Sequence, residues 1–360
     1  MNRLIVKLIP GENDKYHFGE GYLTDSNIIF HSHSLFSAII NNFIKIYGEE
    51  ELTNSINDFK NIKLSSLLPA IYKVENGEIK DFIYFLPKPA TRLGFDEESQ
   101  KEVDDKPKDI KKVQFISVNA LKSHNKKELK KLILGKKFLV EKNEYEVIRN
   151  YGNPKDINLF ESFIEQKVAI DRIKQITLEE GKGQLYSVGY IKPLVSVVNN
   201  NGIIAGFYFL LEFDKNNKSI NRIKSAIKLI EDEGLGGERS TGAGLFKKII
   251  IEELPKNFEE LFENKDKIDT YMAISITIPK TEDEFEKINS YQLMKIGGYI
   301  YSPYTSSKAK KYIYAIKEGA MIRGEIKGNI ENLSPKNYKH EVLVNGKPIL
   351  IPTEYYDNEG

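Results

Sequence analysis

Residues 203–251 read IIAGFYFLLEFDKNNKSINRIKSAIKLIEDEGLGGERSTGAGLFKKIII, and this stretch decides the fold. It begins with a strongly apolar run over 203–213, which predicts a strand. The run at 219–231 places its isoleucines on one helical stripe and predicts an amphipathic helix. A glycine-rich loop at 234–244 then leads into a second predicted strand at 246–251. The stretch is therefore predicted to form a strand–helix–strand unit.

The N-terminal part of the chain repeats this order. Residues 3–9 (RLIVKLI) predict a strand. Leu35, Ile39 and Phe43 then recur at four-residue spacing, which predicts one apolar face of a helix of about three turns. Ser32 or Ser34 is a candidate N-cap for this helix. A further strand is predicted over Phe82–Leu86. Two strand–helix–strand units therefore predict an α+β, ferredoxin-like or RRM-like core.

The predicted domain organisation is two units with an inserted segment. The first unit covers 1–250, with an insertion at about 87–185, and a smaller α+β unit covers 251–360. Within the insertion, residues 94–112 are almost wholly charged and predict a mobile loop. Lys126–Leu134 predicts a basic helix.

Two turn signals and a set of tyrosines complete the prediction. Asn199-Asn200-Asn201-Gly202 predicts the turn between two strands. Asn345-Gly346 predicts a hairpin turn near the end of the chain. Tyr299, Tyr301 and Tyr304 are expected to pack within strands and loops.

The composition excludes several classes of protein. The chain has 360 residues and no cysteine, so disulfides and thiolate metal sites are excluded. No stretch approaches the roughly 18 consecutive apolar residues of a membrane helix. The opening MNRLIVKLIP lacks the cleavage site of a signal peptide, so a cytoplasmic location is expected. The net charge is only +1, so any contact with nucleic acid must be local.

The glycine-rich loop carries the sharpest chemical signal. Five glycines lie within Gly234–Gly244, where they allow positive φ and close approach to a polyanion. Consecutive backbone N–H groups there could form an anion nest, with Arg239, Ser240 and Thr241 as further donors. A tight helix-to-strand connection without a ligand is the alternative, and the sequence leaves both open. The loop has neither the P-loop spacing nor a preceding strand, so it is not a known nucleotide cradle.

The histidines allow several roles. His17, His31 and His33 could bind a metal only with converging geometry, and the i, i+2 pair diverges in an extended chain. One histidine could act as a general base on an RNA 2′-hydroxyl. His17 and Phe18 could instead stack on bases. For His33, a helix-cap or core position is an equal alternative.

An alternating run near residue 170 offers a second cationic face. Arg172 and Lys174 lie on one side of a predicted strand, where an RNA backbone could lie. A solvated strand face is the alternative interpretation of the same charges.

Taken together, these motifs resemble a known family. The segments that carry the resemblance are His17-Phe18-Gly19, His31-Ser32-His33-Ser34-Leu35-Phe36-Ser37-Ala38, Gly183-Gln184-Leu185-Tyr186 after Arg172, Gly236–Phe246, Tyr291-Gln292-Leu293, Gly297-Gly298-Tyr299 and Lys317-Glu318-Gly319-Ala320. They resemble the RAMP superfamily and, within it, the fourth Csm subunit of type III-A CRISPR complexes. His33-Ser34 stands where that family usually has Asp-Thr.

The resemblance implies RAMP ferredoxin-like domains with an inserted thumb-like segment, and a non-catalytic role without cofactor or metal. It implies binding of the repeat-derived 5′ handle of the crRNA, beside a large polymerase-like Csm subunit and a backbone Csm subunit. The residues predicted to contact RNA are His17, Phe18, Gly19, His31, Ser32, Arg172, Lys174, Gly236, Gly237, Arg239, Ser240, Thr241, Gly242 and Gly244.

Two other functions stay open at this stage. Guide-processing RAMP proteins share the glycine-rich loop, so the chain could be a metal-independent endoribonuclease that processes repeat RNA. His17 would then be its general base. The chain could also be a scaffolding subunit that makes no RNA contact.

Overall fold

The structure, a computed structural model, describes residues 1–19, 21–168, 170–171, 176–177, 185–263, 267–300 and 308–357. Its largest element is a ten-stranded sheet ordered β14-β1-β13-β3-β4-β5-β7-β6, with β2 and β12 paired to β13. The strands of this sheet are β1 (Asn2–Ile9), β2 (Lys63–Leu64), β3 (Leu68–Glu75), β4 (Glu78–Pro87), β5 (Phe115–Ser117), β6 (Ile133–Leu134), β7 (Phe138–Leu139), β12 (Val195–Val198), β13 (Asn201–Phe213) and β14 (Lys248–Glu253).

Within this sheet, four strands and two helices form the predicted ferredoxin-like core. The chain runs β1, α1 (Ser32–Lys60), β3, then β13, α6 (Ile220–Lys228) and β14. The spatial order β14-β1-β13-β3 is the 4-1-3-2 arrangement of a βαββαβ unit. The predicted α+β class is confirmed, since every β1, β13 and β14 pairing is antiparallel.

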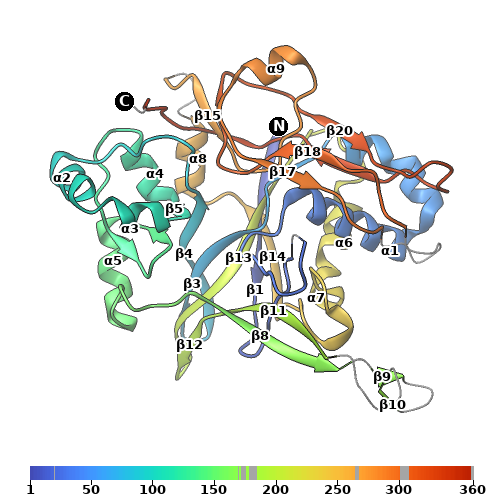
Figure 1. The fold of residues 1–360 in the computed structure, drawn as a ribbon, viewed down its shortest axis with the longest axis horizontal. Coiled ribbons are helices and arrows are strands. Elements are labelled where there is room, and N and C mark those ends of the chain that lie inside the picture. Colours follow the sequence, from blue (N-terminus) through green and yellow to red (C-terminus); the bar gives the residue numbers. More distant parts are fainter. Residues whose placement is uncertain are drawn as a thin grey trace.

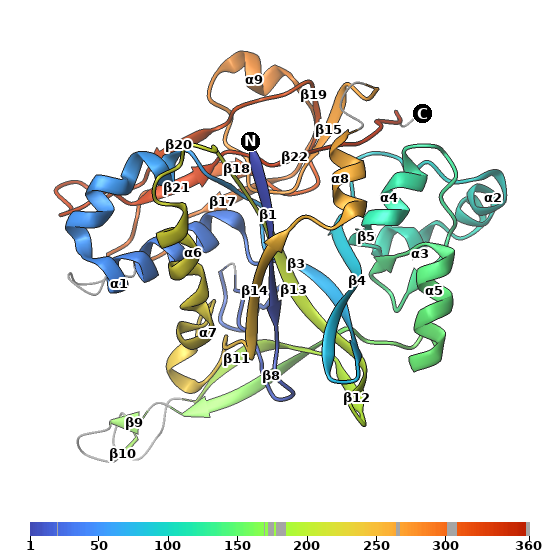
Figure 2. The same cartoon turned by 180° about the vertical axis from the view of Figure 1, so that it is seen from behind.

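The sheet is buried on both faces because alternate residues of its strands enter different cores. In β1, Val6 and Leu8 pack with the apolar faces of α1 and α6. Ile5 and Ile9 point the other way, toward α8 (Lys256–Glu263) and β15 (Thr270–Ala273). Figures 1 and 2 show α1 and α6 on one side of the central strands and the helices of the insertion on the other.

The predicted helix near residue 34 is confirmed and extends further than expected. The α1 segment starts at Ser32 and breaks at Gly48, which has φ 85° and ψ 170°, before continuing to Lys60. The predicted turn before β13 is also confirmed, because Asn199 and Asn200 both adopt positive φ between β12 and β13.

The prediction of a mobile loop at 94–112 is wrong. This segment forms α2 (Glu97–Asp105) and α3 (Pro107–Lys112). Asp96 caps α2 by accepting the Ser99 amide at 2.8 Å, and Pro107 occupies the first turn of α3. These local signals outweigh a composition that favours disorder.

The predicted basic helix at Lys126–Leu134 is also wrong. The helix is α4 (Val118–His124), capped by the Ser117 hydroxyl, which accepts the Ala120 amide at 3.0 Å. Lys127 follows with a positive φ of 59°, which ends the helix before the lysine run. Further along the insertion lies α5 (Lys142–Ile148).

Two antiparallel strands close the insertion. They are β8 (Phe160–Val168) and β11 (Leu185–Pro193), which pair along their whole length. Figure 1 shows this hairpin projecting from the bottom of the molecule, with β9 (Ile170–Asp171) and β10 (Ile176–Thr177) beyond it.

Among the described residues after β14, the chain forms one four-stranded sheet and two small hairpins. The sheet has the order β16-β19-β15-β22, and the hairpins are β17/β18 and β20/β21. The remaining strands of this part are β16 (Ile288–Ser290), β17 (Leu293–Ile296), β18 (Ile313–Ile316), β19 (Met321–Arg323), β20 (Asn329–Asn332), β21 (Leu343–Gly346) and β22 (Leu350–Pro352). A short helix, α9 (Glu282–Glu286), precedes β16.

Two predictions in this part are wrong. Asn345-Gly346 is no hairpin turn, because both residues pair with β20 inside β21 and the Asn345 amide group donates to the buried Ile62 carbonyl. Tyr299 does not pack, since it is 78% exposed. Tyr301 and Tyr304 lie outside the described residues.

Candidate nucleic-acid interface

The glycine-rich loop is fastened to the segment that follows β1. The loop leaves α7 (Ile230–Glu233) and reaches β14. The Gly237 amide donates to the His17 carbonyl at 3.0 Å, and the Gly244 amide donates to the Lys15 carbonyl at 2.8 Å. Two predicted site segments more than 200 residues apart in the sequence therefore lie side by side.

Close packing on His17 explains several of the glycines. A Cβ on Gly236 would lie 2.4 Å from the His17 carbonyl oxygen, and the residue has a φ of 87°. A Cβ on Gly237 would lie 2.7 Å from the His17 ring. Gly242 differs, because its φ is 85° but no atom lies within 4 Å of the added carbon. The first two glycines therefore serve internal packing, while Gly242 serves a turn that faces outward.

The predicted anion nest of bare amides can involve only part of the loop. Besides Gly237 and Gly244, the amides of Thr241 and Ala243 donate to the Glu238 carbonyl, and that of Gly242 donates to the Arg239 carbonyl. These bonds close a short 3-10 turn over Arg239–Thr241. Most amides of the loop therefore have acceptors within the protein.

The outward surface of the loop is the segment Ser240–Gly242, which we call the crest. All three of its residues are exposed. Arg239 lies half-buried beside the crest and donates from Nη1 to the Glu233 carbonyl at 3.3 Å. A guanidinium has five donors, enough to hold that carbonyl and a phosphate together.

Cations that the sequence analysis missed lie beside the crest. Lys167 of β8 donates to Glu238 Oε2 at 2.6 Å and to Thr241 Oγ1 at 3.0 Å. Partial burial opposes its charge, but the hydrogen bond to Glu238 and the negative charge of that carboxylate raise the pKa of Lys167. The Nζ atom of Lys15 lies 4.6 Å from the centre of the Tyr190 ring, and the Nζ atom of Lys167 lies 5.2 Å from the same centre. Only the fold could reveal this group, because its members come from three distant segments.

His17 is held under the loop in one tautomer. Its Nδ1 lies 2.7 Å from the Gly189 carbonyl, so Nδ1 carries the proton and donates it. A Cβ on Gly19 would lie 2.9 Å from His17 Nε2, so this glycine also packs against the ring. The residue is 8% exposed.

The predicted stacking of Phe18 on bases is wrong for this conformation. The residue is 2% exposed, and its ring packs against Tyr16, Phe30 and Phe207 in the core. Phe18 therefore anchors the segment that carries His17 and does not offer a face to a ligand.

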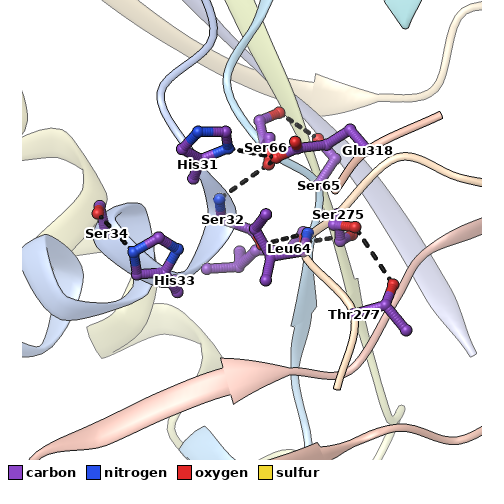
Figure 3. Close-up of polar contacts among 11 residues, drawn as sticks. His31, Ser32, His33, Ser34, Leu64, Ser65, Ser66, Ser275, Thr277 and Glu318 are labelled. Atoms are coloured by element: carbon purple, nitrogen blue, oxygen red, sulfur yellow. Dashed lines mark hydrogen bonds and ion pairs between the residues drawn. The ribbon is translucent and has the colours of Figure 1, made fainter. Parts of the chain in front are cut away.

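His31 and Ser32 lie in a different place from the loop, where they join α1 to the C-terminal part (Figure 3). His31 Nδ1 lies 2.8 Å from Glu318 Oε1, which also accepts the Ser66 hydroxyl. The Ile276 amide donates to Ser32 Oγ at 3.0 Å. Both predicted RNA contacts are buried and serve this junction, so their assignment to RNA is corrected.

The junction also fixes the charge of Glu318. Burial opposes its ionisation, but the charge of His31 and the bonds from His31 and Ser66 hold its pKa below the usual range. The ring of His33 stacks on that of His31 with centroids 5.9 Å apart and an interplanar angle of 16°.

Arg172 and Lys174 lie outside the described residues. Across the described ranges, no group of three His, Asp or Glu side chains is placed to hold a metal ion. In the same ranges, no helix is both long and apolar enough to cross a membrane.

Comparisons with known proteins identify the family. A model of the RAMP superfamily matches residues 15–247, and a model of the CRISPR Csm4 C-terminal domain matches residues 266–353. The CRISPR system Cms protein Csm4 of Methanocaldococcus jannaschii is 39% identical over 384 residues, which cover 97% of this chain and 97% of that protein. The chain belongs to the Csm4 family of the RAMP superfamily. The resemblance predicted from the sequence is thereby confirmed.

Other relatives agree with this membership. The Csm4 protein of Streptococcus thermophilus is 24% identical over 94% of this Csm4-family chain and 95% of its own length. A chain in the crystal structure of the Csm3–Csm4 subcomplex of the type III-A CRISPR-Cas interference complex matches with a TM-score of 0.69. It is 33% identical and covers 98% of this chain and 99% of its own. A chain of the Csm1–Csm4 cassette with pppApA shares the fold, with a TM-score of 0.55 at 16% identity and 99% coverage of both chains.

Proposed function

We propose that this Csm4-family chain is a non-catalytic subunit of a type III-A CRISPR effector that binds the 5′ handle of the crRNA. Its similarity to a chain from a Csm3–Csm4 subcomplex supports a backbone Csm subunit as one neighbour. Its fold, shared with a chain from a Csm1–Csm4 cassette, supports the large polymerase-like subunit as another. We place the protein in the cytoplasm with that complex.

The crest carries this proposal. Ser240 presents its hydroxyl to solvent, and Arg239 lies directly beside it. Thr241 is exposed as well, but its hydroxyl donates to the Glu238 carbonyl and accepts from Lys167, so it extends the polar surface without adding a free donor. Lys167 and Lys15 add positive charge from β8 and from the segment after β1. Hydroxyls and guanidinium groups are the donors that hold a nucleic-acid backbone in register, so the crest suits a ribose-phosphate chain.

The β8–β11 hairpin extends this surface. The ion pair of Lys167 with Glu238 joins the hairpin to the loop. The ion pair of Lys15 with Glu165 joins the hairpin to the segment after β1. The hairpin also exposes Ile164 at 61% and Leu185 at 72%, so its surface carries apolar side chains as well as charges. We assign it the thumb-like role, packing against RNA that passes the crest. The domain boundaries at 1–250 and 251–360, with an insertion over about 87–185, remain a prediction.

The endoribonuclease alternative is not favoured. A general base must reach the proton that it removes, within about 3 Å. The only ring nitrogen of His17 that can accept a proton is Nε2, and Gly19 and Gly237 pack against the ring. Repeat RNA incubated with the purified protein and no metal is expected to stay intact. Cleavage that His17→Ala abolishes would establish the enzyme and overturn the proposal.

The binding test uses Arg239→Ala, with Arg149→Ala as its matched control. Arg149 is an exposed arginine in the insertion, and its partner is Glu146. Handle RNA is titrated against each variant over a range of salt concentrations. Arg239→Ala should weaken binding and reduce the salt slope by about one unit, because one phosphate contact is lost. Identical curves for the two variants would favour a scaffolding subunit without RNA contact at the crest.

A further inference from the structure

Residues 288–317 differ in charge from the rest of the chain. They contain five lysines and six tyrosines but no aspartate or glutamate, in a protein whose net charge is only +1. This segment includes β17, β18 and the connection between them. A local concentration of positive charge and aromatic rings is the composition of a surface for single-stranded nucleic acid.

The β17–β18 hairpin has one face in the core and one in solvent. Register pairs Lys295 with Tyr314 and Ile296 with Ile313. Ile296 packs inward, in a core completed by the following side chains: Ile276, Ile278, Met294, Ile313, Ala315, Leu333 and Val344. On the opposite face, Tyr312 is 63% exposed, Tyr314 is 60% exposed and Leu293 is 55% exposed. The outer face therefore combines apolar and aromatic side chains that lie outside the hydrophobic core.

The rings on this outer face lie within reach of a cation. Lys295 Nζ lies 4.2 Å from the centre of the Tyr312 ring. Tyr312 and Tyr314 have centroids 6.3 Å apart and planes at 86°, so they do not stack on each other. The two rings meet edge to face, and Lys295 lies over one face of Tyr312, so a base would stack on a ring face that these contacts leave open. Lys295 would supply a charge for the phosphate next to that base.

The same character continues past the end of the hairpin. Tyr299 forms a bridge with Ala309 and is 78% exposed. Lys308 and Lys311, which flank this bridge, are exposed as well. Protein interfaces are rich in tyrosine but depleted in lysine, so the lysines favour a polyanion over a protein partner.

We propose that the outer face of β17–β18, with Tyr312, Tyr314 and Lys295 at its centre, binds single-stranded nucleic acid by stacking. Both views place β17–β18 toward the top of the molecule and the β8–β11 hairpin at the bottom (Figures 1 and 2). This surface is therefore separate from the crest, and the inference does not depend on the function proposed for the crest.

The test measures binding of the full chain to a uridine homopolymer of about twelve nucleotides, which lacks any handle sequence. Alanine at both Tyr312 and Tyr314 should weaken binding at least tenfold, since each stacked base contributes roughly fivefold or more. Phenylalanine at both positions should retain most of the affinity, because it keeps the rings. Phe285→Ala is the matched control, an aromatic residue 45% exposed in the acidic helix α9, and should leave binding unchanged.

A second measurement covers the case in which the double alanine variant does not fold. The wild-type protein is photo-crosslinked to the same homopolymer carrying 4-thiouridine, and the modified peptides are mapped. Crosslinks within 293–314 support the proposal. Crosslinks confined to the crest overturn it, as does unchanged affinity of the folded double alanine variant. A double variant that binds RNA normally but loses a protein partner would assign the face to that partner and also overturn it.

Discussion

His124 should make the stability of this protein depend on pH in a range where most side chains do not titrate. The residue is fully buried at the end of α4, where Nδ1 accepts the Gly94 amide at 2.9 Å. Nε2 donates to the Glu354 carbonyl at 3.1 Å. An amide N–H and a carbonyl at the two ring nitrogens specify the neutral imidazole, since a proton on Nδ1 would face another donor. Burial accordingly lowers the pKa of His124 from 6.5 to about 4, despite the bond to Glu354.

The sign and size of the effect follow from these values. Between pH 4 and 6.5, the unfolded chain binds a proton that the folded chain does not, so stability falls as the pH falls. Integrating the difference in bound protons between the unfolded and the folded chain from pH 7.5 to pH 5 gives a loss of about 2 kcal/mol in the free energy of unfolding from this residue alone. The loss corresponds to roughly 0.7 M in the urea midpoint for an m-value near 3 kcal/mol/M.

The assay compares urea unfolding at pH 7.5 and pH 5 for the wild type, His124→Asn and His340→Asn. Asparagine at position 124 removes the titrating group but keeps an acceptor near the Gly94 amide, so the variant should lose less stability on acidification. His340 is exposed, and its variant should behave as the wild type does. An equal loss in all three proteins would refute the assignment of a neutral, buried His124.

Two further predictions concern the junction and the loop. Glu318→Gln should lower the free energy of unfolding by about 3 kcal/mol, measured by chemical denaturation, because it leaves His31 without its buried carboxylate; an unchanged midpoint would show that the ion pair is dispensable. Gly236→Ala should destabilise the protein more than Gly242→Ala. Both positions have a positive φ, which costs an alanine about 1–2 kcal/mol, but at position 236 the added Cβ also clashes with the His17 carbonyl. Equal melting temperatures for the two variants would contradict this difference.

The sequence predicted the core of this protein because its signals there are periodic and mutually consistent. The apolar run of β13 and the isoleucine stripe of α6 each specify one element, and their order specifies the βαββαβ unit. The insertion was harder because its helices are short and polar. Their boundaries depend on single capping residues such as Asp96 and Ser117, which composition does not reveal.

The candidate site was predicted in part, and the errors have one physical cause. The sequence identified the loop and His17, and the fold brings them together. The sequence could not show which side chains would be buried or hydrogen-bonded inside the folded protein. Phe18 enters the core, and His31 and Ser32 enter the α1 junction. A residue type suited to RNA is equally suited to an internal bond, and only burial separates the two uses.

The same distinction identifies the surfaces that remain for ligands. At the loop, most of the amides and the Thr241 hydroxyl take part in internal hydrogen bonds, while Ser240 stays exposed. At β17–β18, the core takes alternate residues and leaves Tyr312 and Tyr314 in water. Exposing large rings costs solvation free energy that folding alone does not recover. A surface that keeps them beside lysines, in a segment (288–317) without aspartate or glutamate, is therefore explained best by a ligand that contributes both phosphates and bases.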